Sequence, residues 1–409
     1  MDPVGAIAGL ATAAVSEQRA PLRILSLADV AEDPNAGAAG AEYQTIRALR
    51  ELGHEVDAVW ADAIGRRIAH GNLHYLLELP RRYDEIVNER LTRGRYDVVH
   101  LNQPHGFRAA RSVQRRWPEV AVVHRSHGFE PRVHEVVSRW ERVHGAQRRA
   151  AWRRAATGAL HGLIDRHNTA ICRWADGHLL CSTQDAAFMR ERFSVADEKI
   201  AVVTHAAPDD YLSAPVAPLT AERLRHVSYV GQFAFVKAPH IVAEAMNAIA
   251  GTHPDVRFTW VAAGADHGRI RALLADPARV ALLDWMPQGE LRAIYDAAGV
   301  FLFPSYFEGT GKASIEALSR GLCVVASDVG GMHDMIEHDR SGILVPPGNA
   351  EAVAAAVRAL LDDPGRAARI AEHAAARARQ FTWRLTAERT AAFYRARIAA
   401  KRAAGGRGS

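Results

Sequence analysis

FPSYFEGTGKASIEALSRGLCVVASDVGGMHDMIEHDRSGILVPPGN, residues 303–349, is the stretch that decides the fold of this chain. A strand is predicted to end at Pro304, a glycine-rich loop follows, and a helix opens near Gly311. Two further apolar runs, Cys323–Ser327 and Ile343–Val345, predict strands separated by a helix. Strands that alternate with helices are typical of a parallel sheet covered by helices.

The same alternation extends outward over almost the whole chain. The other predicted strands are Arg23–Ala28, Glu55–Trp60, Val98–Leu101, Val120–His124, His178–Cys181, Ile200–Thr204, Val227–Gly231, Phe258–Ala263, Val280–Asp284 and Val300–Pro304. Helical patterns are predicted over about 41–52, about 132–170 and about 383–400, and Asp209–Pro218 is predicted to be a linker.

These segments predict an α/β protein with two Rossmann-like domains, 21–215 and 220–380. A C-terminal helix at 381–402 is expected to cross back to the N-terminal domain. Residues 1–20 are predicted to be a disordered extension, and 403–409 a disordered tail rich in glycine and arginine.

Composition narrows the class of protein. The 409 residues are 48% hydrophobic and 24% charged, which is ordinary for a globular protein and too long for one core. No run approaches the roughly 20 apolar residues that cross a bilayer, so a cytoplasmic protein is expected. Cys172, Cys181 and Cys323 lack metal-ligand spacing, and we interpret them as buried reduced thiols rather than a disulfide or zinc site.

Two glutamates in the opening stretch are candidates for ligand binding. Glu308 lies in the loop after a strand and Glu316 lies in the first turns of the next helix. Both are predicted to face the crevice at the carboxyl ends of the strands. The amides from Gly309 to Lys312 begin that helix and can hold an anionic phosphate, while a carboxylate accepts hydrogen bonds from sugar hydroxyls.

This stretch resembles the donor-site motif of glycosyltransferase family four, whose members have the GT-B fold of two Rossmann-like domains facing a central cleft. The resemblance lies in Glu308-x7-Glu316, the turn at Gly321, the VVASDVGG run that ends at Gly331, and GILVPPGN. It implies a retaining transfer of a hexosyl unit from a nucleoside-diphosphate sugar to a hydroxyl acceptor. It also implies that neither a cofactor nor a divalent metal is needed, and no Asp-x-Asp cluster occurs in the predicted donor site.

The resemblance assigns roles to single residues on the donor side. Glu316 would bind the ribose and Glu308 the hydroxyls of the donor sugar, while glycines let the backbone approach the ligand closely. The implied donor-binding residues are Glu316, Gly309, Thr310, Gly311, Lys312, Gly231, Gln232, Gly330 and Gly331.

By the same resemblance, a second motif, SYVGQFAFVKAP at 228–239, would supply a cation for the diphosphate. Lys237 matches the position where the family clamps the leaving group, but Gln232 stands where the family usually has Arg. The segment Asp284–Tyr295 resembles the part that family members place against the base. The implied catalytic residues are Glu308, His127 and Lys237.

The acceptor side is less marked in the sequence. Gly37 and Gly40 in NAGAAGAE, at 35–42, match a glycine-rich acceptor loop of the family, although both are equally well explained as turn glycines. His127 follows a predicted strand and matches the family's cleft histidine. His100 is a weaker neighbouring candidate, since most histidines are structural.

A basic segment at 132–160 carries much of the positive charge. Residues 131–160 hold seven Arg against Glu135 and Glu141, while the net charge of the whole chain is +5. We interpret it first as a solvated helix with tryptophan in the core; the alternative is a surface that docks on an anionic membrane or acceptor. The residues concerned are Arg139, Trp140, Arg142, Arg148, Arg149, Trp152, Arg153 and Arg154. No nucleic-acid-binding pattern is present.

Other functions use the same architecture, because a fold does not determine a reaction. A nucleotide-sugar epimerase or a phosphorylase is one alternative. A non-catalytic subunit that binds a nucleotide sugar is another, suggested by Gln232. The acceptor itself, whether a glycan, a lipid-linked sugar or a small molecule, is left open by the sequence.

Overall fold

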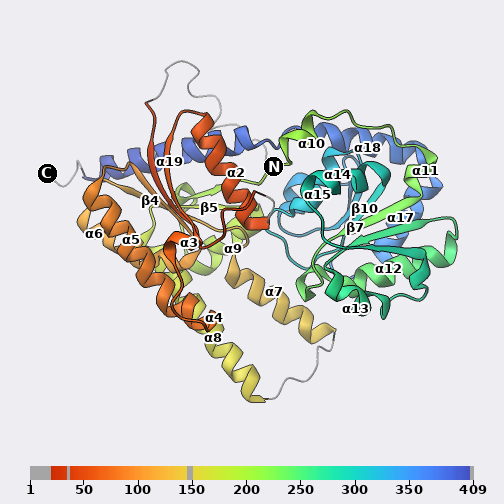
Figure 1. Ribbon diagram of the computed structural model, residues 1–409, viewed down its shortest axis with the longest axis horizontal. Helices are drawn as coiled ribbons and strands as arrows, with labels where there is room; N and C mark the ends of the chain where they lie inside the picture. Colours follow the sequence, from red (N-terminus) through yellow and green to blue (C-terminus); the bar gives the residue numbers. More distant parts are fainter. Residues whose placement is uncertain (1–19, 35–36, 145–150, 406–409) are drawn as a thin grey trace.

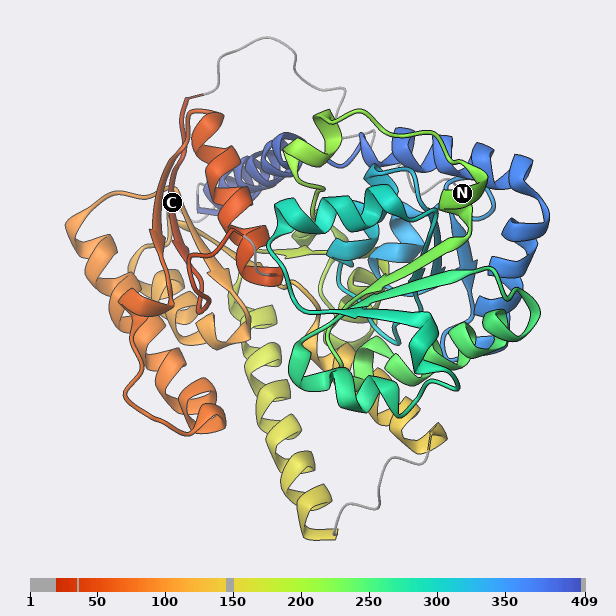
Figure 2. The same ribbon diagram turned by 45° about the vertical axis from the view of Figure 1, so that its right-hand side comes forward.

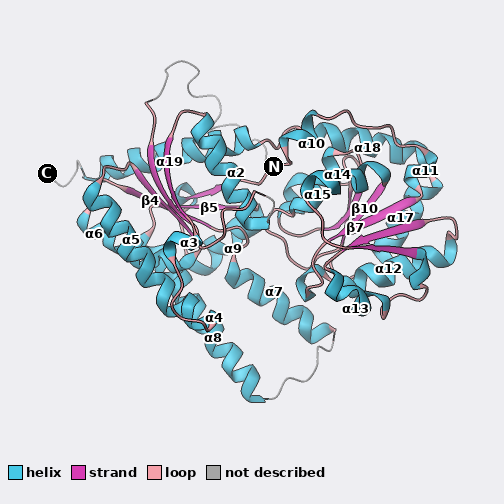
Figure 3. Ribbon diagram, in the orientation of Figure 1, coloured by secondary structure: helices cyan, strands magenta, loops and turns pink. Residues whose placement is uncertain are grey.

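The computed structural model describes residues 20–34, 37–144 and 151–405, without the side chains of 151–157 and 159. Within these residues the chain forms two lobes, each built on a six-stranded parallel sheet with helices on both faces (Figures 1 and 3). The predicted α/β fold class with two Rossmann-like domains is confirmed. No helix in the described part of the chain is both long and apolar enough to span a membrane.

The N-terminal sheet has the strand order β2-β1-β3-β4-β5-β6. Its strands are β1 (Arg23–Leu27), β2 (Glu55–Val59), β3 (Val98–Asn102), β4 (Ala121–Arg125), β5 (Gly177–Leu180) and β6 (Ile200–Val202). The accompanying helices are α2 (Gly37–Glu51), α3 (Ala61–Ile64), α4 (Gly71–Leu73), the π-helical η1 (His74–Glu78), α5 (Leu79–Arg93), α6 (Phe107–Arg116), α7 (Glu130–Val143), α8 (Ala151–Trp174) and α9 (Thr183–Phe193). The short helix α10 (Asp209–Ser213) packs on the C-terminal domain, where Tyr211 joins the core.

The alternation of side chains along each strand divides the core of this domain into two layers. Ile24 and Val98 pack into the layer that contains α2, whereas Leu25 and Val99, their neighbours in sequence, pack into the layer of α5 and α6. Because both faces are covered, β3, β4 and β5 are buried at every position, as expected for a parallel sheet.

The C-terminal sheet has the order β12-β11-β10-β7-β8-β9. Its strands are β7 (His226–Val230), β8 (Arg257–Val261), β9 (Val280–Leu283), β10 (Val300–Phe303), β11 (Cys323–Ser327) and β12 (Ile343–Val345). The helices are α11 (Ala221–Leu224), α12 (Pro239–Thr252), α13 (His267–Arg271), α14 (Gln288–Ala297), α15 (Lys312–Ser319), α16 (Gly331–Met335), α17 (Ala350–Asp362) and α18 (Pro364–Ala378). The strand order reverses between β10 and β7, and ligands of open α/β sheets bind outside such a reversal.

The last helix, α19 (Trp383–Gly405), leaves the C-terminal domain and packs on the N-terminal one (Figure 1). Trp383 and Tyr394 join the core layer of α2, and Lys401 Nζ lies 2.8 Å from Asp176 Oδ2. Residues 403–405, predicted to be part of a disordered tail, belong to this helix. The rest of that tail, 406–409, and residues 1–19 lie outside the described residues.

Three predicted segments differ from the structure. The glycine-rich loop expected at 35–42 is wrong from Gly37 onward, because α2 begins there. The helical region expected at 132–170 forms two helices, α7 and α8, with 145–150 between them outside the described residues. The linker predicted at 209–218 begins with the short helix α10.

Helix α7 of the N-terminal domain reaches the C-terminal domain (Figures 1 and 2). The Trp140 indole stacks on the Tyr306 ring at 4.6 Å between centroids, and a Cβ atom on Gly348 would lie 2.4 Å from that indole. Trp140 therefore takes part in an interdomain contact, in line with the first interpretation of the basic segment. Arg148 and Arg149, and the side chains of Trp152, Arg153 and Arg154, lie outside the description.

Candidate active site

A cavity of about 580 Å³ opens at the carboxyl ends of β7 and β10, where the two domains face each other. Its floor comes from the C-terminal domain and one side from the start of α2. The lining residues include the predicted donor residues Gly231, Gln232, Lys237, Lys312 and Glu316, together with Gly37, Asp33, Trp285, Met286 and Gln288. Trp285 to Gln288 belong to the segment that resembled the base-contacting part of the family.

Lys237 and Glu308 form an ion pair at one end of this cavity. Lys237 Nζ lies 2.6 Å from Glu308 Oε1, and Glu308 is only 5% exposed. Lys237 ends the short 3-10 helix η4 (Phe235–Lys237), which is tied to the β10 loop by a bond from the Tyr306 amide to the Val236 carbonyl. Each charge compensates the other, because removing one member of such a pair would leave the remaining charge without a partner.

Glu316 also lines this cavity, from α15. Its carboxylate accepts hydrogen bonds from Gln288 Nε2 at 2.5 Å and from the Tyr295 hydroxyl at 3.1 Å. Burial raises the pKa of Glu316, although Lys312, Tyr295 and Gln288 act in the opposite direction. The side chain is therefore oriented by α14 before any ligand arrives.

Glycines bring three loops into contact beside the ion pair. A Cβ atom on Gly309 would lie 1.9 Å from the His127 carbonyl oxygen, and one on Gly330 would lie 1.8 Å from the Glu308 carbonyl oxygen. The Gly331 amide donates to the Gly309 carbonyl at 2.7 Å. Only glycine permits these backbone approaches.

Gly311 ends the β10 loop at the N-cap of α15 with φ 78°, a left-handed conformation that favours glycine. Its neighbour Thr310 contacts the other domain, since the Thr310 hydroxyl accepts a hydrogen bond from the His205 amide at 3.3 Å. Thr183 also bonds to Asp334 across the domains. The donor loop is thus part of the seam between the domains.

On the N-terminal side, His127 and His100 meet around Glu42 of α2. His127 Nε2 lies 3.1 Å from Asn102 Oδ1 and 3.6 Å from Glu42 Oε2, and His100 Nε2 lies 3.4 Å from Glu42 Oε1. Burial alone would raise the pKa of Glu42, but His100, His127 and Arg125 lower it overall. His100 also contacts the Tyr394 hydroxyl of α19, so it is a buried member of this network.

Cys181 and His205 complete the surroundings of His127. His127 Nδ1 lies 3.0 Å from His205 Nε2, which lies 3.4 Å from Cys181 Sγ. Burial would raise the pKa of Cys181, but His205, His127 and Arg125 bring that pKa well below its usual value. The three residues follow β4, β5 and β6, neighbouring strands whose carboxyl ends meet at one edge of the sheet.

The remaining predicted residues take different positions. Gly37 lines the donor cavity at the first turn of α2. Gly40 lies against the preceding loop, where a Cβ atom would be 2.6 Å from the Pro34 carbonyl oxygen. Gln232 lies in the cavity wall but carries no charge. The cations that line this cavity in the described chain are therefore Lys237 and Lys312.

Sequence reasoning missed several residues of the site, including Glu42, Gln288, Tyr295, Cys181 and His205. Glu42 gives the clearest signal in hindsight, because it ends the 35–42 segment that resembles the family's acceptor loop. The structure shows this carboxylate buried, and buried carboxylates are usually paired. The sequence locates Tyr295 and Gln288 only as part of the segment Asp284–Tyr295, because no pattern in it marks them individually.

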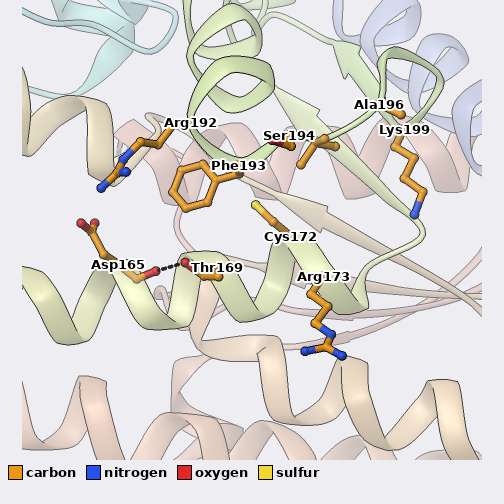
Figure 4. A pocket seen from close by; sticks show the side chains of 10 residues that line it. Asp165, Thr169, Cys172, Arg173, Arg192, Phe193, Ser194, Ala196 and Lys199 are labelled. Atoms are coloured by element: carbon orange, nitrogen blue, oxygen red, sulfur yellow. Dashed lines mark hydrogen bonds between the residues drawn. The ribbon is translucent and has the colours of Figure 1, made fainter.

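A second cavity, of about 540 Å³, lies between α8, α9 and the loop before β6 (Figure 4). Cys172 lies on its floor, and Arg173, Arg192 and Lys199 stand around it (Figure 4). None of the predicted site residues lines it. It is therefore separate from the site described above.

Two matches to known protein families cover most of the chain. Residues 37–210 match the family described as Glycosyltransferase Family 4, and residues 225–363 match the family described as Glycosyl transferases group 1. The chain belongs to glycosyltransferase family four. The predicted resemblance is confirmed, and its two matched regions correspond to the two domains seen here.

Several known proteins are similar to this family-four member. Glycogen synthase from Mycobacterium tuberculosis is 29% identical over 268 residues, 63% of this chain, and the alignment spans 61% of that relative's length. Sucrose-phosphate synthase from Thermosynechococcus elongatus superposes with a TM-score of 0.69 at 22% identity, covering 92% of this chain and all of that one. HepE from Anabaena, solved in complex with UDP and glucose, superposes with a TM-score of 0.63 at 18% identity, covering 90% and 98%. The fold of this family-four chain is therefore GT-B.

Proposed function

We propose that the chain transfers a hexosyl unit from a nucleoside-diphosphate sugar to a hydroxyl acceptor, with retention of the anomeric configuration. The carrying observation is one cavity that is lined both by Lys237, which pairs with Glu308, and by the buried Glu316. Glycogen synthase and HepE with bound UDP and glucose, both similar to this chain, support a nucleotide-sugar donor.

The donor would lie with its nucleotide toward α14 and its sugar toward the seam. Glu316, held by Gln288 and Tyr295, keeps acceptor capacity for ribose hydroxyls. Trp285 is 57% exposed at the cavity and offers a surface for the base. Glu308 and the backbone around Gly309 would then meet the sugar and the diphosphate.

Departure of the diphosphate is the step that this site is built to assist. Negative charge grows on the leaving oxygen, and fixed cations and amide dipoles lower the energy of that state without reorganisation. Lys237, Lys312 and the N-terminus of α15 supply them. We propose that these groups replace a divalent metal in the donor site and that no cofactor takes part.

Glu316→Ala is expected to weaken nucleotide binding about tenfold or more, because hydrogen bonds to a charged group contribute about 1.5–3 kcal/mol. Isothermal titration with the preferred nucleoside diphosphate measures the change. Glu290→Ala, which removes an exposed carboxylate from α14, is the matched control. Equal affinity in the Glu316 variant would remove this carboxylate from the nucleotide site.

Glu308→Gln is expected to lower turnover about tenfold or more while nucleotide affinity changes little, since charge-assisted hydrogen bonds are roughly twice as strong as neutral ones. The amide keeps the shape of the side chain but no longer balances Lys237. Steady-state kinetics that separate kcat from KM test this, with Glu290→Gln as control. Unchanged turnover would argue against a role at the sugar.

A thermal-shift panel of UDP-, GDP- and ADP-sugars identifies the donor, because a ligand of the folded state raises its melting temperature. Product analysis with that donor then separates the candidate reactions. A transferase needs a hydroxyl acceptor, an epimerase converts the donor alone, and a phosphorylase needs phosphate. A subunit that only binds the donor leaves it intact.

The acceptor class is a glycan, a lipid-linked sugar or a small molecule. A lipid-linked acceptor would suit peripheral association of the basic segment 132–160 with an anionic inner membrane face, where each basic residue contributes about 1 kcal/mol. Replacing Arg148, Arg149, Arg153 and Arg154 with Gln should then reduce sedimentation with anionic liposomes. If the unaltered protein does not sediment with such liposomes at low salt, a soluble acceptor in the cytoplasm is the better proposal.

A further inference from the structure

His127, Cys181 and His205 bring three metal-ligand atoms together in the N-terminal domain. One ligand atom from each residue lies within 4.8 Å of the other two. The residues come from different parts of the sequence and meet because they follow β4, β5 and β6 at one edge of the sheet. Nothing in the proposed transfer reaction uses Cys181 or His205.

The distances between these atoms fit a tetrahedral ion. Zn–N bonds of about 2.0–2.1 Å and Zn–S bonds of about 2.3 Å place two nitrogens about 3.3 Å apart and a nitrogen and a sulfur about 3.5 Å apart. The observed separations are 3.0 Å between the two imidazole nitrogens and 3.4 Å between His205 Nε2 and Cys181 Sγ. Both separations lie within a few tenths of an ångström of those values, and the ligand atoms of His127 and Cys181 lie within 4.8 Å of each other.

Polar side chains around His127 already orient its ring. A metal-bound imidazole usually donates its other N–H to a carbonyl or carboxylate oxygen, which fixes the ring. His127 Nε2 has Asn102 Oδ1 at 3.1 Å and Glu42 Oε2 at 3.6 Å, while Nδ1 is directed at His205. This arrangement leaves Nδ1 of His127 for the ion.

Burial and access also suit a metal. Cys181 is fully buried and His205 is 6% exposed, whereas the His127 side chain is 9% exposed and adjoins the seam between the domains. Three protein ligands with a fourth position open to water are the pattern of accessible zinc sites. A thiolate with two imidazoles selects zinc and similar soft transition ions over Mg²⁺ or Ca²⁺.

We propose that His127, Cys181 and His205 form a binding site for Zn²⁺ or a similar thiophilic divalent ion, and that its occupation inhibits the enzyme. The Cys181 sulfur coordinates as thiolate, and any proton that it carries passes to solvent on binding. The inhibitory part rests on the proposed function, because it requires His127 to serve the acceptor side. The His205 amide also contacts Thr310 of the donor loop, so the site adjoins the seam between the domains.

The test uses the full chain, reduced, treated with a chelator and then titrated with Co²⁺ as a spectroscopic substitute for Zn²⁺. We expect one equivalent per chain, intense visible bands of a tetrahedral ion, and a near-ultraviolet thiolate-to-cobalt band that Zn²⁺ removes. Cys181→Ser should abolish the thiolate band, and His205→Gln should weaken binding about 10–100-fold or more. Cys172→Ser, which alters another buried thiol, should bind as the unaltered chain does.

Absence of the thiolate band in the unaltered chain, or its persistence in Cys181→Ser, overturns the site. Transfer assays then test the second part. Zn²⁺ should slow the unaltered enzyme reversibly with chelator and should slow Cys181→Ser far less. A chain that binds Co²⁺ as described and loses no transfer activity to Zn²⁺ overturns the inhibitory role alone. A chain that binds Co²⁺ yet transfers nothing without metal refutes the proposed function and leaves the site intact.

Discussion

Lys237→Met is expected to lose about 10²–10³-fold in turnover, the usual effect of removing one preorganised group that stabilises developing charge. The methionine side chain fills a similar volume without the cation. The Lys237 ammonium lies 2.6 Å from Glu308 and lines the donor cavity, so its loss affects both the diphosphate and the carboxylate. Nucleotide affinity should fall less than turnover does, because the charge on the leaving group is greatest in the transition state.

Lys199→Met is the matched control for this variant. Lys199 lines the separate cavity beside α9 (Figure 4). Its replacement removes the same charge from the chain. Steady-state rates with the preferred donor, compared after circular dichroism has shown both variants folded, give the answer. If the two variants turn over equally, Lys237 does not assist departure of the diphosphate.

Gly309→Ala is expected to reduce kcat/KM about 10²-fold, since a displacement of about 1 Å in a reacting site costs that much. The new methyl group would lie 1.9 Å from the His127 carbonyl oxygen and 2.9 Å from its carbon. These are backbone atoms and cannot rotate away, so the donor loop must withdraw from the N-terminal domain. The loss should appear mainly in activity, because opening the seam relieves the clash without unfolding either domain.

Gly289→Ala tests whether any glycine replacement has this effect. Gly289 lies at the start of α14, and a Cβ atom there meets nothing within 4 Å. The Gly289 variant should keep its activity and its melting temperature. Full activity in Gly309→Ala would mean that the seam seen here is not needed for transfer.

The sequence predicts the strands and the positions of Glu308 and Glu316 after β10, because both are local in sequence. Glu308 and Glu316 are separated by one loop and part of one helix, so their spacing fixes where each lies relative to β10. Lys237 is more distant, but it follows β7, which pairs with β10. Strand-end positions therefore predict the cavity even though the Lys237–Glu308 contact itself is not visible in the sequence.

The N-terminal side could not be predicted in the same way. Gly37 and Gly40 stand among alanines, where loop and helix are equally compatible with the residues, and packing against the preceding loop favours the helix. Cys181 and His205 lack any metal-ligand spacing along the chain, since strand order alone brings them to His127. Spacing rules find sites within one segment and miss sites made by neighbouring strands.

The interdomain contact of Trp140 could not be predicted from the sequence either. A tryptophan on a basic amphipathic helix predicts either a buried position or a lipid surface. The choice depends on Tyr306 and Gly348, which belong to the other domain and form the surface that receives the indole. No pattern within 132–160 carries that information.

Transfer from the donor that the thermal-shift panel selects tests the central claim most directly. Purified chain is incubated with that donor, with and without pooled short glucans, sugar phosphates and lipid-linked saccharides, and without added metal. We predict that nucleoside diphosphate is released only with an acceptor, that NMR shows a new glycosidic bond with the donor's anomeric configuration, and that Lys237→Met forms almost none. A donor that binds and stays intact with every acceptor, or a product of inverted configuration, would contradict the account.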